Sequence, residues 1–435
     1  MFEKFLEVVE ARGLFSPSDR LLVATSGGVD SMALCHLLNR GQFKFSVAHC
    51  NFKLRGTDAD LDEALVMNWC TDNGIKFYSK SFNTKIYAMD KHLSMQMAAR
   101  ELRYEWFKKL LAAHNFKRLL VAHHLDDSFE TVLFNLVRGT GLRGVTGVPE
   151  KVNKIVRPLS SFTRHEILEY ARQSDLKWRE DASNSDPKYH RNRIRNHIIP
   201  ELKKINPSLL DTFRSTQARL TSSQAYLDCV LDKKIKRLTQ FKDSDIFVNT
   251  KSITSIVELE YLLKPYSFNY SQMMDILDAC LQGESGKLFF SPTYKLNVDR
   301  GQIIISPLLD QFSTIEIESG NAEVCNELFA LRLTVLPVSA GIKASADQAS
   351  LDLDELAFPL TLRKWCKGDF FYPLGMSGKK KISDYMIDSK IPLNLKSRIG
   401  ILESAGNIVW LVGHRIDDRF KVTDRTKRIC RIDLI

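Results

Sequence analysis

Paired cysteines are missing from this 435-residue sequence, although it contains eight cysteines. No two of them form a C-x-x-C motif, which argues against a zinc ribbon, an iron–sulfur centre and a redox dithiol. The G-x-x-x-x-G-K-[ST] motif is also missing, because the nearest candidates, at residues 283–287 and 375–379, are too short and lack the following Ser or Thr. The sequence therefore does not predict an NTPase that cleaves ATP between the β and γ phosphates.

Long apolar runs, a secretory signal and internal repeats are missing as well. No uncharged run approaches the roughly 18 residues that a membrane helix needs, and the N-terminus has no basic flank followed by an apolar region. We therefore expect a cytoplasmic protein with no membrane partner. The net charge of +10 fits an anionic partner, most commonly nucleic acid, although solubility alone also explains it.

Short apolar runs alternate with helical patterns in the first third of the chain. We expect strands at residues 21–25, 44–49, 75–79 and 118–122, and helices at 30–40, 58–73, 94–114 and 126–138. Strands that alternate with helices of this length indicate a parallel sheet covered on both faces. The sequence thus predicts an α/β domain with a doubly wound parallel sheet over residues 1–210.

The pattern changes near residue 196, and the length of the chain allows two or three domains. Residues 208–238 read as one or two long helices, and residues 286–306 as short strands with a turn at 299–301. We expect a mainly helical middle domain over 211–315. Residues 320–435 alternate short apolar runs with Gly and Pro turns, which indicates a small α+β C-terminal domain.

A glycine-rich segment, SGGVDS, joins the first expected strand to the first helix. Glycine lets the backbone approach a phosphate closely, and the helix N-terminus attracts an anion. An ordinary strand-to-helix turn often contains the same residue types. The residues expected to bind a nucleotide here are Ser26, Gly27, Gly28, Val29, Asp30 and Ser31.

All six positions match the SGGxDS signature of the PP-loop ATP-pyrophosphatase superfamily, whose members cleave ATP between the α and β phosphates and adenylate a substrate oxygen. Further segments resemble the tRNA(Ile)-lysidine synthetases, densely over residues 20–207 and again near 363–422. Asn51 departs from the pattern, because many relatives carry an acidic residue there. The matching segments are HCN at 49–51, LRG at 54–56, AARELRY at 98–104, AHHLDDSFET at 122–131, RGTGLRG at 138–144, RPL at 157–159, WREDASN at 178–184, RNRIR at 191–195, KGD at 367–369, PLG at 373–375 and KKK at 379–381.

This resemblance implies a reaction with ATP and Mg²⁺ as cofactors. The C2 oxygen of the wobble cytidine in a tRNA(Ile) with a CAU anticodon attacks the α-phosphate of ATP, and pyrophosphate leaves. The ε-amine of free L-lysine then attacks C2, and AMP leaves. The product, lysidine, pairs with A instead of G. The sequence leaves a homodimer open.

The resemblance also suggests roles for single residues. Asp127 and Glu130 share a helix face and could hold the lysine ammonium and accept its proton, although helix capping also favours acids there. Asp30 could hold Mg²⁺ or only cap its helix, and His49 could contact the adenylate or end a strand. A phosphohydrolase-type metal site, formed by the histidines at 123–124 with the acids at 126–127, is a weaker alternative.

Two groups of basic residues complete the expected site. Arg100 and Arg103 share a helix face and could stabilise charge in the transition state, or pair with Glu101 and Glu105 on a solvated helix. The residues expected to bind tRNA phosphates are Arg191, Arg193, Arg195, Lys379, Lys380 and Lys381, although each charge run could equally be a solvated face.

Two other functions compete with this interpretation. A different PP-loop enzyme, such as a tRNA thiolase, would usually carry paired cysteines, and an amidotransferase-linked synthetase would need a nucleophilic cysteine at a tight glycine turn; neither occurs in the sequence. A non-catalytic tRNA-binding adaptor is disfavoured by the intact SGGVDS segment. The C-terminal domain carries no second glycine loop, so we expect it to bind tRNA and to take no part in catalysis.

Overall fold

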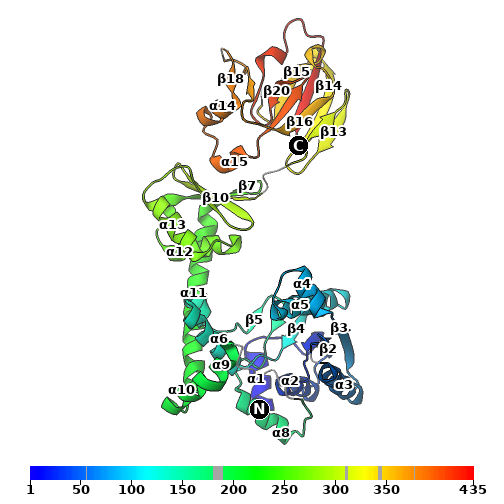
Figure 1. Ribbon diagram of the computed structural model, residues 1–435, viewed down its shortest axis with the longest axis vertical. Helices are drawn as coiled ribbons and strands as arrows, with labels where there is room; N and C mark the ends of the chain where they lie inside the picture. Colours follow the sequence, from blue (N-terminus) through cyan, green and yellow to red (C-terminus); the bar gives the residue numbers. More distant parts are fainter. Residues whose placement is uncertain (55, 180–189, 309–311, 341–344, 377) are drawn as a thin grey trace. The chain divides into compact units, whose positions relative to one another are not determined.

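The chain forms two compact units, Met1–Leu227 and Asp228–Ile435, in the computed structural model shown in Figure 1. The structure describes all residues except 55, 180–189, 309–311, 341–344 and 377, and the side chains of residues 190, 191 and 340. Among the described residues, none of the helices combines the length and apolar character that a membrane crossing requires.

The first unit contains a six-stranded sheet of order β3-β2-β1-β4-β6-β5. All neighbouring strands pair in parallel except β5 and β6, which are antiparallel. The strands are β1 (Leu21–Ala24), β2 (Phe45–Asn51), β3 (Lys76–Ser81), β4 (Arg118–Val121), β5 (Lys151–Val152) and β6 (Ile155–Val156). The four expected strands are confirmed, whereas the two-residue β5 and β6 are too short to show a sequence period.

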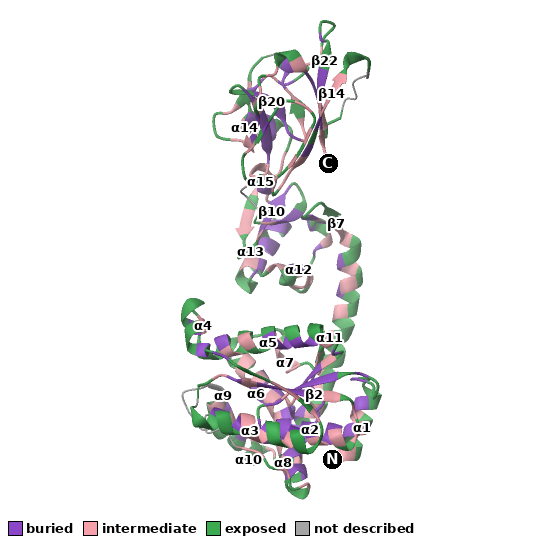
Figure 2. Cartoon of the chain, turned by 90° about the vertical axis from the view of Figure 1, so that its right-hand side faces the viewer, coloured by how far each residue is buried: buried purple, intermediate pink, exposed green. Residues whose placement is uncertain are grey.

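Helices cover both faces of this sheet, as a doubly wound fold requires. One face carries α1 (Phe2–Ala11), α2 (Val29–Arg40), α3 (Thr57–Asp72) and α8 (Arg164–Gln173), and the other carries α5 (Met95–Ala113), against which α4 (Thr84–Asp90) packs (Figures 1 and 2). A hydrophobic core lies on each face of the sheet. Alternate residues of β1 point to opposite faces, so Leu21 and Val23 pack in one core and Leu22 packs in the other. The carboxyl ends of the parallel strands meet at one edge of the sheet.

A separate helical group in the first unit packs around α6 (Leu125–Arg138). It comprises α7 (Leu142–Val145), α9 (His190–Arg193), a π-helical segment (Ile194–Ile198), α10 (Ile199–Ile205) and the start of α11 (Leu209–Leu238). Phe129, Ile194 and Phe213 belong to its core. The expected domain boundary at 210 lies at the start of α11, and the two units divide further along this helix, after Leu227.

The second unit begins with a five-stranded sheet of order β7-β8-β11-β10-β9 beside two helices. The strands are β7 (Thr239–Lys242), β8 (Asp245–Asn249), β9 (Lys287–Phe290), β10 (Tyr294–Asp299) and β11 (Gln302–Pro307), and the helices are α12 (Ile256–Leu263) and α13 (Tyr270–Leu281). The expected turn is present between β10 and β11, where Arg300 and Gly301 have positive φ. The middle of the chain thus combines its helices with a sheet.

Two antiparallel sheets, β12-β16-β19-β20-β21 and β13-β14-β22-β15, pack around Trp410 in the C-terminal part. The strands are β12 (Ile315–Ile317), β13 (Ala322–Cys325), β14 (Ala330–Pro337), β15 (Gln348–Asp352), β16 (Leu360–Lys364), β19 (Gly400–Ser404), β20 (Asn407–Leu411), β21 (Arg415–Ile416) and β22 (Arg428–Leu434). The small β17 (Phe370–Phe371) and β18 (Lys380–Lys381), α14 (Ile382–Asp388) and α15 (Leu393–Lys396) complete the expected α+β domain.

A buried ion pair joins the two parts of the second unit. Arg398, just after α15, donates to Asp245 of β8 at 2.7 Å and to the carbonyl oxygen of Pro307 at 2.7 Å. Both charged side chains are only 11% exposed. Removing one partner of such a pair leaves the other charge buried and uncompensated.

We expect Arg398→Ala to lower the unfolding free energy of the second unit by about 3 kcal/mol. For a unit of this size, that corresponds to a decrease of roughly 6–12 °C in its thermal transition, measured by calorimetry on the full chain. Arg428→Ala is the matched control, because Arg428 pairs with Asp354 on an exposed surface and should change stability by less than about 1 kcal/mol. Equal shifts for the two variants would contradict the prediction.

Candidate active site

The SGGVDS loop leaves β1 and enters α2 with its glycines where the backbone requires them. Gly27 has φ +89°, a left-handed conformation that favours glycine. Ser31 donates its hydroxyl to the carbonyl oxygen of Gly28 at 2.9 Å and accepts from the N–H of Ser26 at 3.3 Å. Gly28 caps α2 without a side-chain hydrogen bond. The first-turn N–H groups of α2 are therefore suited to bind an anion.

Arg179, in the segment after α8, holds this loop in place. Its backbone N–H donates to the carbonyl oxygen of Gly27 at 3.1 Å. Its guanidinium donates to Asp62 at 2.8 Å and to Asp58 at 2.7 Å, both on α3. Sequence reasoning noted the segment containing Arg179 but gave this residue no role, because nothing in the sequence signals that it closes onto a loop about 150 residues earlier.

Acidic side chains from two helices converge beside the loop. Asp30 lies in the first turn of α2, while Asp127 and Glu130 lie on α6, which follows β4. His124 joins them: its Nε2 is 3.8 Å from Asp30 Oδ2 and 3.5 Å from Asp127 Oδ2. The expected capping role of Asp127 is also present, since Asp127 accepts from the N–H of His124 in a capping box.

Arg195 occupies the expected amine site. Its Nε donates to Glu130 Oε1 at 2.5 Å, and its Nη2 donates to Glu130 Oε2 at 3.0 Å and to Asp127 Oδ1 at 3.4 Å. Glu130 is 1% exposed, and its carboxylate contributes to raising the pKa of Arg195. Sequence reasoning placed Asp127 and Glu130 together correctly, but it placed Arg195 among the tRNA contacts.

The surroundings of Asp30 fit a magnesium ion. Burial away from water raises the pKa of Asp30, and the nearby carboxylate of Asp127 raises it further. Its Oδ1 is buried and has no hydrogen-bond partner in the structure. Within the described part of the chain, no group of three or more His, Cys, Asp or Glu side chains could hold a metal by itself. Mg²⁺ commonly binds through one or two carboxylates together with substrate phosphates, so a single carboxylate such as Asp30 is a compatible ligand from the protein.

The two neighbouring histidines differ in their surroundings. His124 faces the carboxylates, whereas the ring of His123 accepts from Arg157 at 3.3 Å. The alternative of a phosphohydrolase-type centre would need both rings to face one metal. His49 is buried at the end of β2, with its Nδ1 2.9 Å from the carbonyl oxygen of Thr25. This contact fixes His49 beside the start of the SGGVDS loop.

Arg100 and Arg103 are exposed on α5 and lie over different aromatic rings. The guanidinium of Arg100 is 4.9 Å from the ring centre of Tyr104, and that of Arg103 is 5.1 Å from the ring centre of Phe52. Their expected acidic partners have other contacts: Glu101 accepts from Tyr87, and Glu105 pairs with Lys109. Among the described contacts, none joins either arginine to Asp30 or Asp127.

The remaining residues expected to bind tRNA divide between the units. In the first unit, Arg193 is exposed, and the side chain of Arg191 lies outside the described residues. In the second unit, Lys379 lies over the ring of Phe370, and Lys380 pairs with Asp388 at 2.5 Å. Lys381 is exposed in β18. Lys379 and Lys381 are thus the more accessible members of this lysine run.

Comparison with known proteins assigns the chain to a family. Residues 2–202 match the PP-loop domain, 242–308 the TilS substrate binding domain and 360–434 the TilS substrate C-terminal domain. The tRNA(Ile)-lysidine synthase of Parabacteroides distasonis is 37% identical over 431 residues, and that of Bacteroides thetaiotaomicron is 36% identical over 427 residues; each alignment covers 98% of both chains. A solved U34-tRNA thiolase, NcsA from Methanococcus maripaludis, aligns over 50% of this chain and 78% of its own at 18% identity, with a TM-score of 0.42.

The matches to the curated relatives run almost from end to end of the chain. The chain therefore belongs to the tRNA(Ile)-lysidine synthase family of ATP-using enzymes.

Proposed function

We propose that the chain joins free lysine to C2 of the wobble cytidine in a tRNA(Ile) with a CAU anticodon. The observation that carries this proposal is the carboxylate pair beside the ATP loop, which already holds a cation, the guanidinium of Arg195. Two carboxylates that bind a guanidinium can also bind the ammonium group of a lysine. An amine-binding site next to an adenylating loop is what the ligation needs.

In the first step, the cytidine O2 attacks the α-phosphorus of ATP, and the bond to pyrophosphate breaks. The N–H groups at the start of α2 bind the phosphates. Asp30 would hold Mg²⁺, which neutralises charge on the phosphates when it is bound. Arg100 and Arg103 are proposed to stabilise negative charge on the reacting phosphate, once the RNA is in place.

In the second step, the lysine ammonium displaces Arg195 from Asp127 and Glu130. One of these carboxylates takes a proton from the ammonium, and the free amine attacks C2 of the cytidine. The bond between C2 and the bridging oxygen then breaks, and AMP leaves with that oxygen. Arg193, Lys379 and Lys381 would bind tRNA phosphates, as exposed cations on basic segments do.

The first test concerns the products. Incubation of the chain with ATP, Mg²⁺, lysine and an unmodified tRNA(Ile) transcript should yield AMP and pyrophosphate in equal amounts. The wobble cytidine should gain the mass of one lysine less one water, measured by mass spectrometry of the digested RNA. ADP and phosphate as the only nucleotide products would refute the proposal, as would a modified base elsewhere.

The second test concerns the amine site. Glu130→Gln and Asp127→Asn should raise the KM for lysine by roughly tenfold to a hundredfold, because a charged hydrogen bond contributes about 1.5–3 kcal/mol. Adenylation should persist, measured as pyrophosphate exchange into ATP with tRNA and without lysine. Asp126→Asn is the matched control, since Asp126 lies in the same turn but accepts from the N–H of Arg164. The assignment fails if all three variants use lysine alike.

The third test uses the raised pKa of Asp30. Burial makes the folded chain bind more protons than the unfolded chain in the range between the ordinary and the raised pKa, so stability falls as pH rises through that range. The ionised carboxylate therefore destabilises the fold at pH 7, and Asp30→Asn should keep or raise the melting temperature. The difference from the unchanged chain should shrink as the pH falls toward about 4.

The same Asp30→Asn variant should lose Mg²⁺-dependent adenylation by roughly a hundredfold or more, as expected when a positioned charge is removed from the transition state. A variant with lower stability at pH 7 and normal adenylation would show that Asp30 only caps α2.

A further inference from the structure

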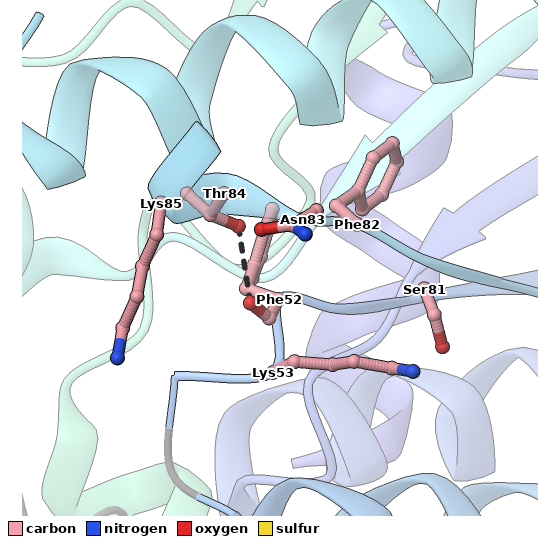
Figure 3. A pocket seen from close by; sticks show the side chains of 7 residues that line it. All are labelled: Phe52, Lys53, Ser81, Phe82, Asn83, Thr84 and Lys85. Atoms are coloured by element: carbon pink, nitrogen blue, oxygen red, sulfur yellow. Dashed lines mark hydrogen bonds between the residues drawn. The ribbon is translucent and has the colours of Figure 1, made fainter. Parts of the chain in front are cut away.

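A pocket of about 280 Å³ lies at the carboxyl ends of β2 and β3, apart from the loop and carboxylates described above (Figure 3). Phe52 and Lys53, directly after β2, form one part of its lining. Residues 81–85, which end β3 and begin α4, form the rest. The volume is just below the usual range for small-molecule sites, about 300–1,000 Å³, so it suits one phosphate or sugar-phosphate group.

The walls of this pocket are fixed by the packing beneath them. The hydroxyl of Thr84 donates to the carbonyl oxygen of Phe52 at 3.1 Å. The N–H of Phe82 donates to the carbonyl oxygen of Asn51 at 2.8 Å. The rings of Phe52 and Phe82 stack with their centres 5.6 Å apart. The two segments that carry the polar lining residues are thus bound to each other.

Positive charge surrounds the pocket. Lys53 and Lys85 are exposed, and Figure 3 shows their side chains extending to opposite sides of Phe52. Neither ammonium has an ion pair among the described residues, and no acidic residue lines the pocket. The pocket therefore attracts an anion and repels free lysine.

The aromatic side chains of the pocket are already covered. Phe52 contacts Phe82 on one side and has the guanidinium of Arg103 5.1 Å from its ring centre. Lys80 lies 5.4 Å from the ring centre of Phe82. A nucleobase would need a free ring face for stacking, whereas a phosphate needs only the exposed cations and hydroxyls. The chemistry of the lining thus favours a phosphate.

The position of the pocket selects RNA as the source of that phosphate. ATP is expected at the end of β1, and β2 lies between β1 and β3 in the sheet. Neighbouring strands are about 4.8 Å apart, so the pocket lies on the order of 10 Å along the same edge from the ATP loop. We propose that it binds a backbone phosphate of the tRNA next to the reacting cytidine, an inference that rests on the proposed function.

The test removes the two charges without disturbing the fold. Lys53 has φ +51°, a conformation that asparagine tolerates well, so Lys53→Asn is combined with Lys85→Gln. A positive charge in the first turn does not stabilise a helix, so the second change should leave α4 intact. Lys154→Gln is the matched control, because Lys154 is exposed but precedes β6 at the opposite, amino edge of the sheet.

Binding of unmodified tRNA(Ile) transcript is measured by filter retention, without ATP, over a range of salt concentrations. The double variant should bind roughly tenfold more weakly, and its slope of log K against log salt should fall by about 1. The control should match the unchanged chain. In steady-state assays, the KM for tRNA should rise, while the KM values for ATP and lysine stay the same.

Two outcomes would overturn this inference. The first is a double variant that binds tRNA with the same affinity and salt slope as the control. The pocket would then not bind RNA, and its anionic partner would be another molecule. The second is an increase in the KM for ATP with unchanged tRNA binding, which would assign the pocket to the nucleotide. Failure of the proposed function looks different: the unchanged chain would then form no lysidine, whatever the double variant does to RNA binding.

Discussion

Mutual repulsion of closely placed carboxylates is the constraint on which the rest of the site depends. Asp30, Asp127 and Glu130 lie beside a loop that must also bind a triphosphate, so the site needs positive charge to exist at all. The structure supplies it from two directions: the N-terminus of α2 and the guanidinium of Arg195. The ring of His124 contributes a hydrogen bond instead, because its Nδ1 accepts from the N–H of Asp127. Burial away from water is the main cause of the raised pKa of Asp30, and the carboxylate of Asp127 adds to it. A divalent cation and a lysine ammonium are the two charges that the proposed reaction adds.

The parallel sheet organises these charges along one edge. Because the strands share a direction, the segments that follow β1, β2, β3 and β4 all emerge side by side. The segments after β1 and β4 carry the acidic residues Asp30, Asp127 and Glu130. Those after β2 and β3 carry Lys53 and Lys85 without ion pairs in the described part of the chain. In the proposed reaction, one edge would thus hold the cationic amine of lysine near the carboxylates and a phosphate of the RNA near the two lysines.

The sequence predicted this edge well because its signals are local. The ends of β1 and α2, the SGGVDS loop and the i, i+3 spacing of Asp127 and Glu130 each depend on a few neighbouring residues. The two-residue β5 and β6 were missed, since so short a run has no period. The sheet beside α12 and α13 was only partly foreseen, because β7 and β8 lie between helical patterns. Arg179 and its contacts with Gly27 and Asp62 were missed because they connect residues more than 100 positions apart.

The contact of Arg195 with Glu130 could not be predicted from neighbouring residues in the sequence. Arg191, Arg193 and Arg195 alternate in the sequence, so they read as one basic surface, yet side chains two positions apart do not share a helix face. The helix changes to a π-helical segment at Ile194, next to Arg195, and such changes of helical geometry often occur at functional sites. Ile194 is buried against α6, Arg193 is exposed, and Arg195 points to Glu130. The charge balance of the carboxylates therefore depends on how this segment packs against α6, and not only on residues within α6 itself.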